Sequence, residues 1–568
     1  MLGQAPTAPA PVIRKTIQTS DGKTITGQVI AEGLAGLQLR TDDKKIVLLR
    51  KDSPGSEEGK YRVVTSQTDW PTYNGEPGAN RYSKLTQINA SNVKNLGPRW
   101  MFPIPNARQV ETTPLVVDGI MYLTMANECW ALDAGSGREL WHYQRARTRG
   151  LSGNAAIGIN RGAASAGDRV FMLTDNAHLI ALDRLNGELL WETEMADWHQ
   201  NYNGTAAPLT VGDLVITGVA GGDGGARGFI AAYQQSTGKE VWRLWTTPLP
   251  GEPGSETWKG KDTEHRSGAT WMTGSYDAEL DTVYWPVGNP GPDYTGDERQ
   301  GDNLYTDSIL ALDPKTGKMK WYYQFTPHDL HDWDAQEPPV LVDANWQGQP
   351  RKLLMEANRN GFFYVLDRTN GKLLLGKPFL KKLNWAEGIG PDGRPILKDL
   401  PKDANGNTYV CPSFQGGANW YSTSFNPATG LFYFNALERC NLFNSVHGEW
   451  VAGRGYMGGS ARPAPGESFQ KFLRAIDIQT GAIKWDLPQV TGTGTATASA
   501  GVLSTASGLV FFGENSGAFA AAGAKDGKVL WQFPTNQVWK SSPMTYMFDN
   551  KQYVAIAVGS DMMAFGLP

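Results

Sequence analysis

The chain has 568 residues, of which 66 are Gly, 34 are Pro and 20 are Trp, a composition typical of a turn-rich protein built from β-strands. Its formal net charge of −4 gives no basic surface for nucleic acid, and no apolar run approaches the roughly 18 residues of a membrane-spanning helix. The sequence contains no Cys-x-x-Cys-His motif, which excludes an attached c-type haem, and no Gly-x-Gly-x-x-Gly between a strand and a helix, which argues against a nicotinamide site.

Residues 1–11 are predicted to form a disordered leader, because they lack the apolar stretch of a secretory signal peptide. Two origins stay open. The segment is either the start of a mature periplasmic chain whose signal peptide has been removed, or the leader of a cytosolic protein. We expect the first, and therefore a periplasmic protein.

Residues 12–66 are predicted to form a small β module that precedes the main domain. Apolar and polar residues alternate through this segment around turns at Asp21-Gly22 and Asp42-Asp43, which indicates about four short strands. Nothing in the segment resembles a catalytic site. We expect a small barrel or sheet.

An eleven-residue pattern, Ala-x-Asp-x-x-x-Gly-x-x-x-Trp, recurs through the rest of the chain. In each copy one strand ends in the Asp, a turn places the Gly in the left-handed region, and a second strand ends in the Trp, which predicts a β-hairpin. Four copies are complete and three are degenerate; the copies begin at Ala131, Ala181, Ala232, Ala311, Val365, Ala475 and Ala521.

The spacing of these copies predicts how the hairpins assemble. Gly137 and Gly187, the glycines of the first two copies, are 50 residues apart. A unit of this size cannot bury its apolar face alone, so neighbouring units must stack, and four-stranded blades around a central axis meet that requirement.

Two further expectations complete the predicted ring. The 110 residues between Gly371 and Gly481 are expected to hide a further, decayed blade near residues 426–434. The first strands after Trp70 are expected to close the ring with the last ones. The sequence therefore predicts an all-β fold, with an eight-bladed β-propeller carrying Trp-docking repeats over residues 67–568.

Three segments depart from the repeat and bring oxygen ligands. Asp332 and Asp334 flank Trp333, and in an extended strand residues two apart point to the same face, so both carboxylates can converge. Asp223 lies in a glycine-dense segment that would let the backbone approach a ligand closely, and Asn289 lies in a Gly-Asn-Pro turn. An all-oxygen set suits a hard cation, although each residue taken singly is more often a solvated turn residue.

These segments, in this order, resemble those of the pyrroloquinoline quinone (PQQ)-dependent alcohol dehydrogenases, the family of methanol and ethanol dehydrogenases. The resemblance covers residues 67–568 and includes the Trp repeats. Its segments are QVETTPLVVDGIMY, NRG, GGDGGARG, ATW, GNPGP, HDLHDWD, NRNG and GGANW. It implies an enzyme that oxidises an alcohol with PQQ and one metal ion as cofactors.

The resemblance also implies roles for single residues. Asp332 would be the catalytic base, and Arg359 would lie beside the reactive carbonyl of the quinone. The metal ion would be held by Asp223, Asn289, Asp332 and Asp334. Further cofactor contacts would come from Glu111, Arg161, Thr174, Gly221, Gly222, Trp271 (stacked under the quinone plane) and Asn419. A disulfide would join Cys411 to Cys440, with two buried thiols as the alternative.

Some positions depart from the family pattern. Ala155-Ala156 stand where relatives have two adjacent cysteines over the quinone, and Asp223 stands where they have a metal-binding Glu. The substrate therefore stays open. The metal does too: Asp334 adds a carboxylate that favours a trivalent lanthanide, whereas Asp223 weakens the lanthanide match in favour of Ca²⁺.

With no haem of its own, the chain is expected to pass electrons to a separate c-type cytochrome or another acceptor. No nucleic acid and no membrane span are expected among its partners, and a homodimer stays open. The alternatives are a PQQ-dependent sugar, polyol or aldehyde dehydrogenase, a PQQ-binding sensor, and a non-catalytic Trp-repeat scaffold.

Overall fold

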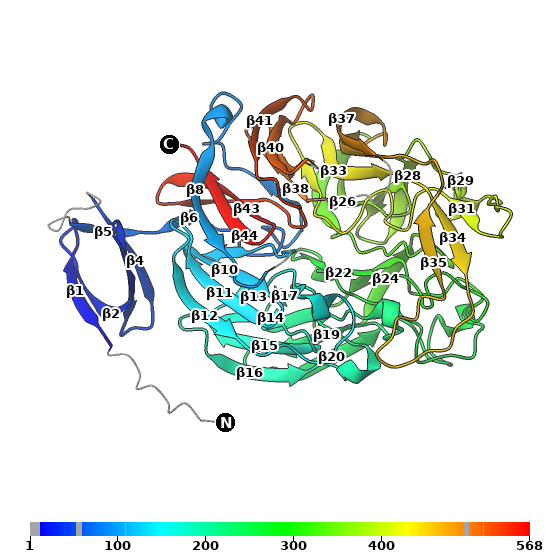
Figure 1. Ribbon diagram of the computed structural model, residues 1–568, viewed down its shortest axis with the longest axis horizontal. Helices are drawn as coiled ribbons and strands as arrows, with labels where there is room; N and C mark the ends of the chain where they lie inside the picture. The colour runs from blue at the N-terminus through cyan, green and yellow to red at the C-terminus, as the bar shows by residue number, and fades with distance from the viewer. Residues whose placement is uncertain (1–11, 53–59, 108–109, 493–498, 515) are drawn as a thin grey trace.

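The computed structural model describes residues 12–52, 60–107, 110–492, 499–514 and 516–568, so the predicted leader at residues 1–11 lies outside the described residues. Within these ranges the secondary structure consists of β-strands and five short 3₁₀ helices, and no helix is long and apolar enough to cross a membrane. Figure 1 shows a small module, β1–β5, beside a large ring of sheets. The all-β prediction is confirmed.

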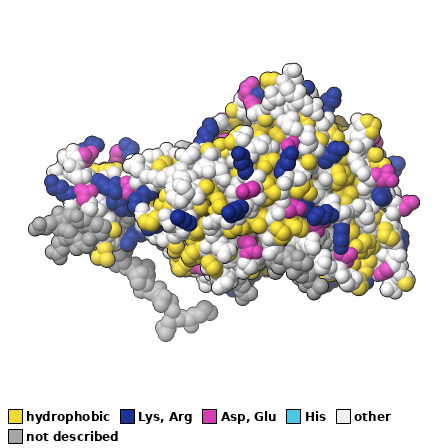
Figure 2. All heavy atoms as spheres, turned by 90° about the horizontal axis from the view of Figure 1, so that it is seen from above, with side chains coloured by type: hydrophobic (Ala, Val, Ile, Leu, Met, Phe, Trp, Pro, Cys, Tyr) yellow, Lys and Arg dark blue, Asp and Glu magenta, His cyan; other side chains and the backbone are white. Residues whose placement is uncertain are grey.

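The N-terminal module is a five-stranded antiparallel sheet in sequence order, where about four strands were expected. A bridge between Thr19 and Tyr61 links its first strand to its last. Figure 2 shows Lys and Arg side chains on its surface. Its strands are β1 (Arg14–Gln18), β2 (Thr24–Glu32), β3 (Gly36–Thr41), β4 (Ile46–Lys51) and β5 (Tyr61–Val64).

The module is anchored to the ring through Asp133, whose side chain is fully buried. Gln38 donates a hydrogen bond to this carboxylate at 2.8 Å, and Arg50 forms an ion pair with it at 2.5 Å. Because a buried carboxylate is costly unless it is paired, these two contacts fix the module against the first sheet of the ring.

Eight sheets of four or five strands make up the ring in the described residues, and each of the first five is a four-stranded antiparallel meander (Figure 1). Their strands are β9 (Leu115–Val117), β10 (Ile120–Met125), β11 (Glu128–Asp133), β12 (Glu139–Gln144), β13 (Ala164–Ala166), β14 (Arg169–Leu173), β15 (His178–Asp183), β16 (Leu189–Glu194), β17 (Leu209–Val211), β18 (Leu214–Gly218), β19 (Phe229–Gln234), β20 (Glu240–Trp245), β21 (Ser275–Asp277), β22 (Thr282–Val287), β23 (Ser308–Leu312), β24 (Met319–Gln324), β25 (Val340–Trp346), β26 (Gln349–Ala357), β27 (Phe362–Asp367) and β28 (Lys372–Pro378).

The last three sheets of the ring combine strands from distant parts of the chain. The sixth consists of β32 (Ser424–Asn426), β33 (Leu431–Glu438), β36 (Phe469–Asp477) and β37 (Ile483–Gly492); the seventh of β38 (Val502–Thr505), β39 (Leu509–Gly513), β40 (Ala518–Gly523), β41 (Val529–Pro534) and β7 (Tyr82–Ser83); the eighth of β42 (Met544–Phe548), β43 (Lys551–Val558), β44 (Asp561–Gly566), β6 (Ser66–Thr68) and β8 (Gly97–Pro103).

Two smaller sheets and five short helices lie in the connections. The sheets are β29 (Ala386–Ile389) with β30 (Pro395–Leu397), and β31 (Thr408–Val410) with β34 (Asn441–Ser445) and β35 (Gly459–Pro463). The helices are η1 (Val93–Asn95), η2 (Asn154–Ile157), η3 (Trp198–Gln200), η4 (Gly222–Gly224) and η5 (Ser255–Thr257).

The ring closes as expected, because β8 pairs with β44 and β7 pairs with β38. The expectation of a separate decayed blade near residues 426–434 is wrong. β32 and β33 are the first two strands of the same sheet that β36 and β37 complete, so the long interval reflects an insertion, β34 and β35, inside one sheet. The eighth sheet is instead the one that contains both ends of the ring.

The repeated Asp and Gly shape the turn between the last two strands of a sheet. In the first copy the Gly137 N–H donates to the Asp133 carbonyl at 2.8 Å, and in the second the Gly187 N–H donates to the Asp183 carbonyl at the same distance. Both glycines have positive φ, 68° and 76°. Since other residues are strained there, the pattern requires Gly at this position.

Five of the repeat Trp residues pack on the repeat glycine of the following sheet: Trp141, Trp191, Trp242, Trp321 and Trp485. A Cβ on Gly187 would lie 2.6 Å from Cε3 of Trp141, and a Cβ on Gly238 would lie 2.4 Å from Cε3 of Trp191. The indole N–H of Trp141 donates to the Arg184 carbonyl at 3.0 Å. The repeat therefore encodes contacts between neighbouring sheets as well as the hairpin within one sheet.

Candidate active site

A cavity of about 520 Å³ opens among loops that connect different sheets of the ring. Thr174 and Asn289 are the two predicted site residues that do not line it: the Thr174 hydroxyl is buried and donates to Asn176 at 2.8 Å, whereas the backbone N–H of Asn289 donates to Asp334 at 3.0 Å. The ten that line it are Glu111, Arg161, Gly221, Gly222, Asp223, Trp271, Asp332, Asp334, Arg359 and Asn419.

Asp332 and Asp334 converge, but not through the strand geometry that the sequence predicted. The segment between β24 and β25 is a loop, and Asp332 has a φ of 61°, which is uncommon for a residue other than Gly. The backbone N–H of Trp333 donates to Asp329 at 2.7 Å and holds this loop. Such conformations concentrate at functional sites, where the surrounding structure maintains them.

Arg359 links the two carboxylates. Its guanidinium donates to Asp334 at 2.9 Å and to Asp332 at 3.4 Å, and it also donates to the Phe414 carbonyl at 2.6 Å. The Asp334 carboxylate thus receives hydrogen bonds from both Arg359 and the backbone of Asn289. These two contacts hold the Asp334 carboxylate beside the Arg359 guanidinium.

Asp332, Asp334 and Asp223 form what we call the acidic group, and burial has the largest effect on their pKa values. Desolvation raises the pKa of Asp332 well above its usual value, although the Arg359 charge opposes the shift, and it raises the pKa of Asp334 to about 6. Asp223 faces the open space of the cavity, but protein surrounds that space, and burial raises the pKa of Asp223 as well. The group is electron-rich and poorly solvated.

Asp293 belongs to the same group and was missed by the sequence analysis. Its carboxylate is fully buried, accepts a hydrogen bond from the Asn289 side chain at 2.9 Å and leaves one oxygen without a partner. Burial raises its pKa well above the usual value, and the Asp223 charge adds to the shift. Its place four residues after Asn289, in the same Gly-Pro-rich turn, is the signal that could have identified it.

In the described part of the chain, no three His, Cys, Asp or Glu side chains lie close enough together to hold a metal ion. The predicted set of Asp223, Asn289, Asp332 and Asp334 is therefore not gathered around one point, because Arg359 takes up oxygens of Asp332 and Asp334. The chemistry of the donors still fits a cation: the buried carboxylates outnumber the guanidinium, and buried charge of one sign requires a counter-ion.

Arg161 occupies a flat slot in the cavity wall. It forms an ion pair with Glu111 at 2.8 Å, and its guanidinium lies 4.6 Å from the ring centres of both Trp271 and Trp420. Cation–π contact with two indoles stabilises this position. Trp420, which the sequence analysis did not single out, is the second indole beside the planar Arg161 guanidinium.

Unsatisfied polar atoms around the cavity fit a polar ligand. Nε of Arg161, Nε of Arg359, Oδ1 of Asn203 and Oε1 of Gln415 are buried, and none has a hydrogen-bond partner among the described residues. All four residues line the cavity. Because an unpaired buried polar atom costs free energy, these atoms indicate contacts that a bound molecule completes.

The glycine-dense turn is covered by a segment far away in sequence, residues 446–458, which the sequence analysis did not identify. Gly221 has a φ of 119°, and a Cβ there would lie 2.2 Å from the Asn201 carbonyl oxygen. The Trp450 indole donates to the Gly224 carbonyl at 2.8 Å, and the Tyr456 N–H donates to the Asp223 carbonyl at 2.6 Å. The glycines thus allow close packing of backbone at one side of the cavity.

The predicted disulfide is confirmed: Cys411 and Cys440 are bonded to each other and are 29 residues apart. The bridge joins the end of β31 to the connection between β33 and β34. Phe414, whose carbonyl accepts a hydrogen bond from Arg359, follows Cys411 by three residues. The disulfide therefore restrains the segment that holds Arg359.

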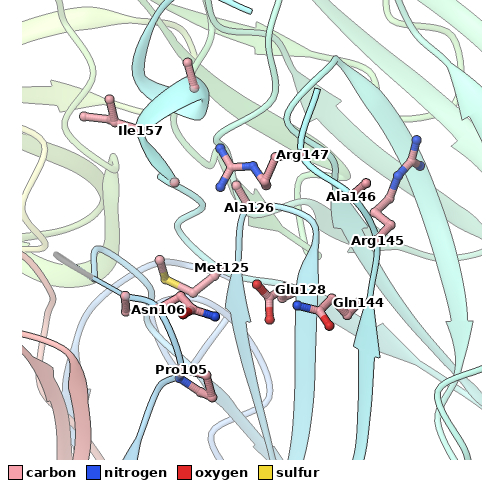
Figure 3. Close-up of a pocket in the computed structure, with 13 residues that line it drawn as sticks. Pro105, Asn106, Met125, Ala126, Glu128, Gln144, Arg145, Ala146, Arg147 and Ile157 are labelled. Carbon is pink, nitrogen blue, oxygen red and sulfur yellow. The ribbon is translucent and has the colours of Figure 1, made fainter. Parts of the chain in front are cut away.

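A larger groove, of about 760 Å³, contains none of the predicted site residues (Figure 3). Figure 3 shows Met125, Glu128 and Gln144 around it, with Ile157 at one side. Ile157 is 74% exposed and lines both the groove and the cavity. The groove and the cavity therefore meet at the segment that follows Ala155-Ala156.

A family model described as "Glucose/ethanol/alcohol dehydrogenase, beta-propeller domain" of the PQQ type matches residues 70–376 and 471–554. The chain belongs to this family. The range between the two matched parts contains both cysteines of the disulfide and the segment that covers the glycine-dense turn.

The chain is similar to proteins named as quinoproteins and methanol dehydrogenases, and the similarity covers most of each chain. A "Quinohemoprotein alcohol dehydrogenase ADH IIB" of Pseudomonas putida is 37% identical, over 89% of this chain and 75% of that protein. A "Lanthanide-dependent methanol dehydrogenase" of Methylorubrum extorquens is 34% identical, over 84% of this chain and 85% of that protein. The solved structure "Europium-containing methanol dehydrogenase" has a TM-score of 0.81 and 30% identity, covering 88% of this chain and 98% of that one.

Proposed function

We propose that this protein is a PQQ-dependent dehydrogenase that oxidises an alcohol and passes the electrons to a separate acceptor. One observation carries the proposal: a single cavity contains both the acidic group with Arg359 and the Trp-lined slot with Arg161. Membership in the family, together with the names of the relatives, supports the same conclusion.

The side chains of the slot and the glycine-dense turn are proposed to bind the cofactor. Trp271 would provide a flat apolar platform, and Arg161 would donate hydrogen bonds to a carboxylate of the cofactor. Further contacts are proposed for Glu111, Thr174, Gly221, Gly222 and Asn419. When bound, PQQ supplies the oxidant that takes the electron pair, and the metal ion supplies Lewis-acid polarisation.

Asp332 is proposed as the base that accepts the proton of the alcohol hydroxyl. Oxidation of an alcohol to a carbonyl compound requires loss of that proton, and an ionised carboxylate within hydrogen-bond distance can take it. Because burial raises the pKa of Asp332, it needs neighbouring positive charge to stay ionised. Arg359 supplies part of this charge, and a bound cation would supply the rest.

Asp223, Asn289, Asp332 and Asp334 are proposed to hold the metal ion. A trivalent lanthanide is favoured by the number of carboxylates and by the relatives named as lanthanide-dependent, whereas the contact of Asp334 with Arg359 leaves fewer oxygens for the ion and favours Ca²⁺. Reconstitution of the protein with PQQ and either La³⁺ or Ca²⁺ separates the two. Activity with Ca²⁺ alone, unaffected by Asp334→Ala, would rule out the lanthanide.

The test of the enzyme itself is dye-linked alcohol oxidation after reconstitution with PQQ and metal. Asp332→Asn is expected to reduce kcat by roughly 100-fold or more, since this is the contribution of a general base, while the cofactor remains bound. Asp297→Asn, on an exposed loop outside the cavity, is the control and should leave kcat unchanged. Equal turnover in Asp332→Asn would remove this residue from the mechanism.

The electron acceptor is proposed to be a soluble c-type cytochrome in the periplasm. This proposal rests on the absence of a Cys-x-x-Cys-His motif from this sequence, and it assigns the uptake of electrons, one at a time, to an external carrier. Reduction of purified cytochromes by the reconstituted enzyme, together with the absence of a haem spectrum in the protein, tests this. Light scattering tests the homodimer, and a substrate panel of alcohols, sugars, polyols and aldehydes identifies the substrate.

A further inference from the structure

Lys540 lines the cavity and has no role in the function proposed so far. It lies in the connection between β41 and β42, and its side chain is 27% exposed. Its one ion pair within the described residues is with Glu111, at 3.9 Å between Nζ and Oε1, which is too long for a hydrogen bond. The ammonium group therefore faces the cavity with its hydrogen-bonding capacity largely unused.

The carboxylate nearest to Lys540 is already engaged by another cation. Glu111 pairs with Arg161 at 2.8 Å, so one carboxylate faces two positive charges. Lys471 on β36 lies close enough for Lys540 to affect its pKa: burial lowers the pKa of Lys471 to about 7, and the Lys540 charge adds to the shift, so Lys471 carries only part of a charge near neutral pH. Lys540 thus lies in a region of positive potential that an anion would stabilise.

The acidic group of the same cavity has the opposite charge balance. Asp223, Asp332 and Asp334 share a single guanidinium, that of Arg359, which is the cation that most affects all three. Without a bound cation a carboxylate of a ligand would be repelled there, whereas it would be attracted to Lys540 and Arg161 with or without the cation. The cavity therefore orients any ligand that carries a carboxylate at one end.

We propose that Lys540, together with Arg161, forms a carboxylate-binding site in this cavity. The carboxylate belongs either to the quinone cofactor or to an acidic alcohol substrate, and both cases rest on the proposed function. Lys540 would donate a charge-assisted hydrogen bond, which is stronger than one between neutral groups. The test below separates the two sources.

The first measurement is the affinity of the apoprotein for PQQ, determined by equilibrium dialysis in the presence of metal. If the cofactor supplies the carboxylate, Lys540→Gln is expected to weaken binding by about tenfold or more, because a hydrogen bond to a charged group is lost. Lys540→Arg, which keeps the charge, should recover most of the affinity. Lys528→Gln, on an exposed turn between β40 and β41, is the matched control and should bind as the wild type does.

The trimethyl ester of PQQ provides a second test of whether the cofactor supplies the carboxylate, because the ester lacks the negative charges of PQQ. The wild type should prefer PQQ to the ester, and Lys540→Gln should lose most of this preference. If the substrate supplies the carboxylate instead, the affinity for PQQ stays constant in Lys540→Gln, while KM rises about tenfold or more for a hydroxy acid such as lactate and not for a neutral alcohol.

Two negative outcomes are distinguishable. If the wild type binds PQQ but Lys540→Gln changes neither its affinity for PQQ nor KM for the hydroxy acid, the carboxylate site at Lys540 is wrong and the proposed function stands. If the wild type does not bind PQQ with La³⁺ or with Ca²⁺, the proposed function is overturned, and the carboxylate site with it.

Discussion

The contact between a repeat Trp and the glycine of the next sheet can be tested at Gly187. Adding a Cβ there places it 2.6 Å from Cε3 of Trp141, at a φ of 76°. The same sheet offers a matched control in Gly167, which also has positive φ, 55°, but has nothing within 4 Å of an added Cβ. Gly167→Ala thus measures backbone strain alone, and Gly187→Ala measures strain together with the collision.

The structure sets the size of each effect. A left-handed non-Gly residue costs about 1–2 kcal/mol, and this applies to both variants. Overpacking against the indole adds about 1–3 kcal/mol at Gly187 only. With an unfolding entropy of about 2.1 cal/mol/K per residue, a chain of 568 residues converts that difference into a Tm lower by about 1–2.5 °C.

Differential scanning calorimetry of the two variants measures this difference. Trp141→Leu in the Gly187→Ala background should reduce the penalty, because Leu375 naturally occupies the Trp position in another copy of the repeat and packs 3.2 Å from a Cβ added to Gly481. Equal Tm values for Gly167→Ala and Gly187→Ala, with no coupling to Trp141, would refute the docking contact as a source of stability.

Two further predictions concern the disulfide bridge and the ionisation of one buried glutamate. Replacing both Cys411 and Cys440 by Ser removes a cross-link between residues 29 apart, and loop-closure entropy predicts a loss of about 3–4 kcal/mol, measurable as a lower Tm that no longer responds to reductant. Burial raises the pKa of Glu356 to about 8, above its value in the unfolded chain, so the stability contributed by its protonated form is lost as pH rises toward 8. Glu356→Gln, which can keep the contact with Asn358, should therefore flatten the dependence of Tm on pH between about 5 and 8; an unchanged slope would contradict the assignment.

The fold was largely predictable because its signal is local and repeated. The turn at Asp133 and Gly137 needs only residues four apart, and each copy of the pattern reports the same hairpin. The failed expectation, a separate blade near residues 426–434, has a matching cause. β33 and β36 are neighbours in one sheet although β34 and β35 separate them in sequence, and no local pattern reports a pairing across an insertion.

The site was predictable to the extent that its residues lie in recognisable segments. Asp332, Arg359 and Trp271 were placed in one cavity by resemblance to a family, and the structure brings them together. Trp420 and Lys540 were missed for different reasons: Trp420 lies in the GGANW segment, of which only Asn419 was singled out, and nothing in the segment around Lys540 indicates a ligand. Each acquires its role only from side chains on other sheets.

The sequence by itself determined the hairpin repeat, the all-β class, the family and the residue types that can bind a cation or a quinone, since all of these are written in short segments. The tertiary structure decided how the charges are distributed. It bound Asp334 to Arg359, gave Asp332 a left-handed backbone and brought Lys540 to the wall that holds Glu111. These features depend on distances between loops of different sheets, and such distances are fixed only when the ring closes and the sheets dock on one another.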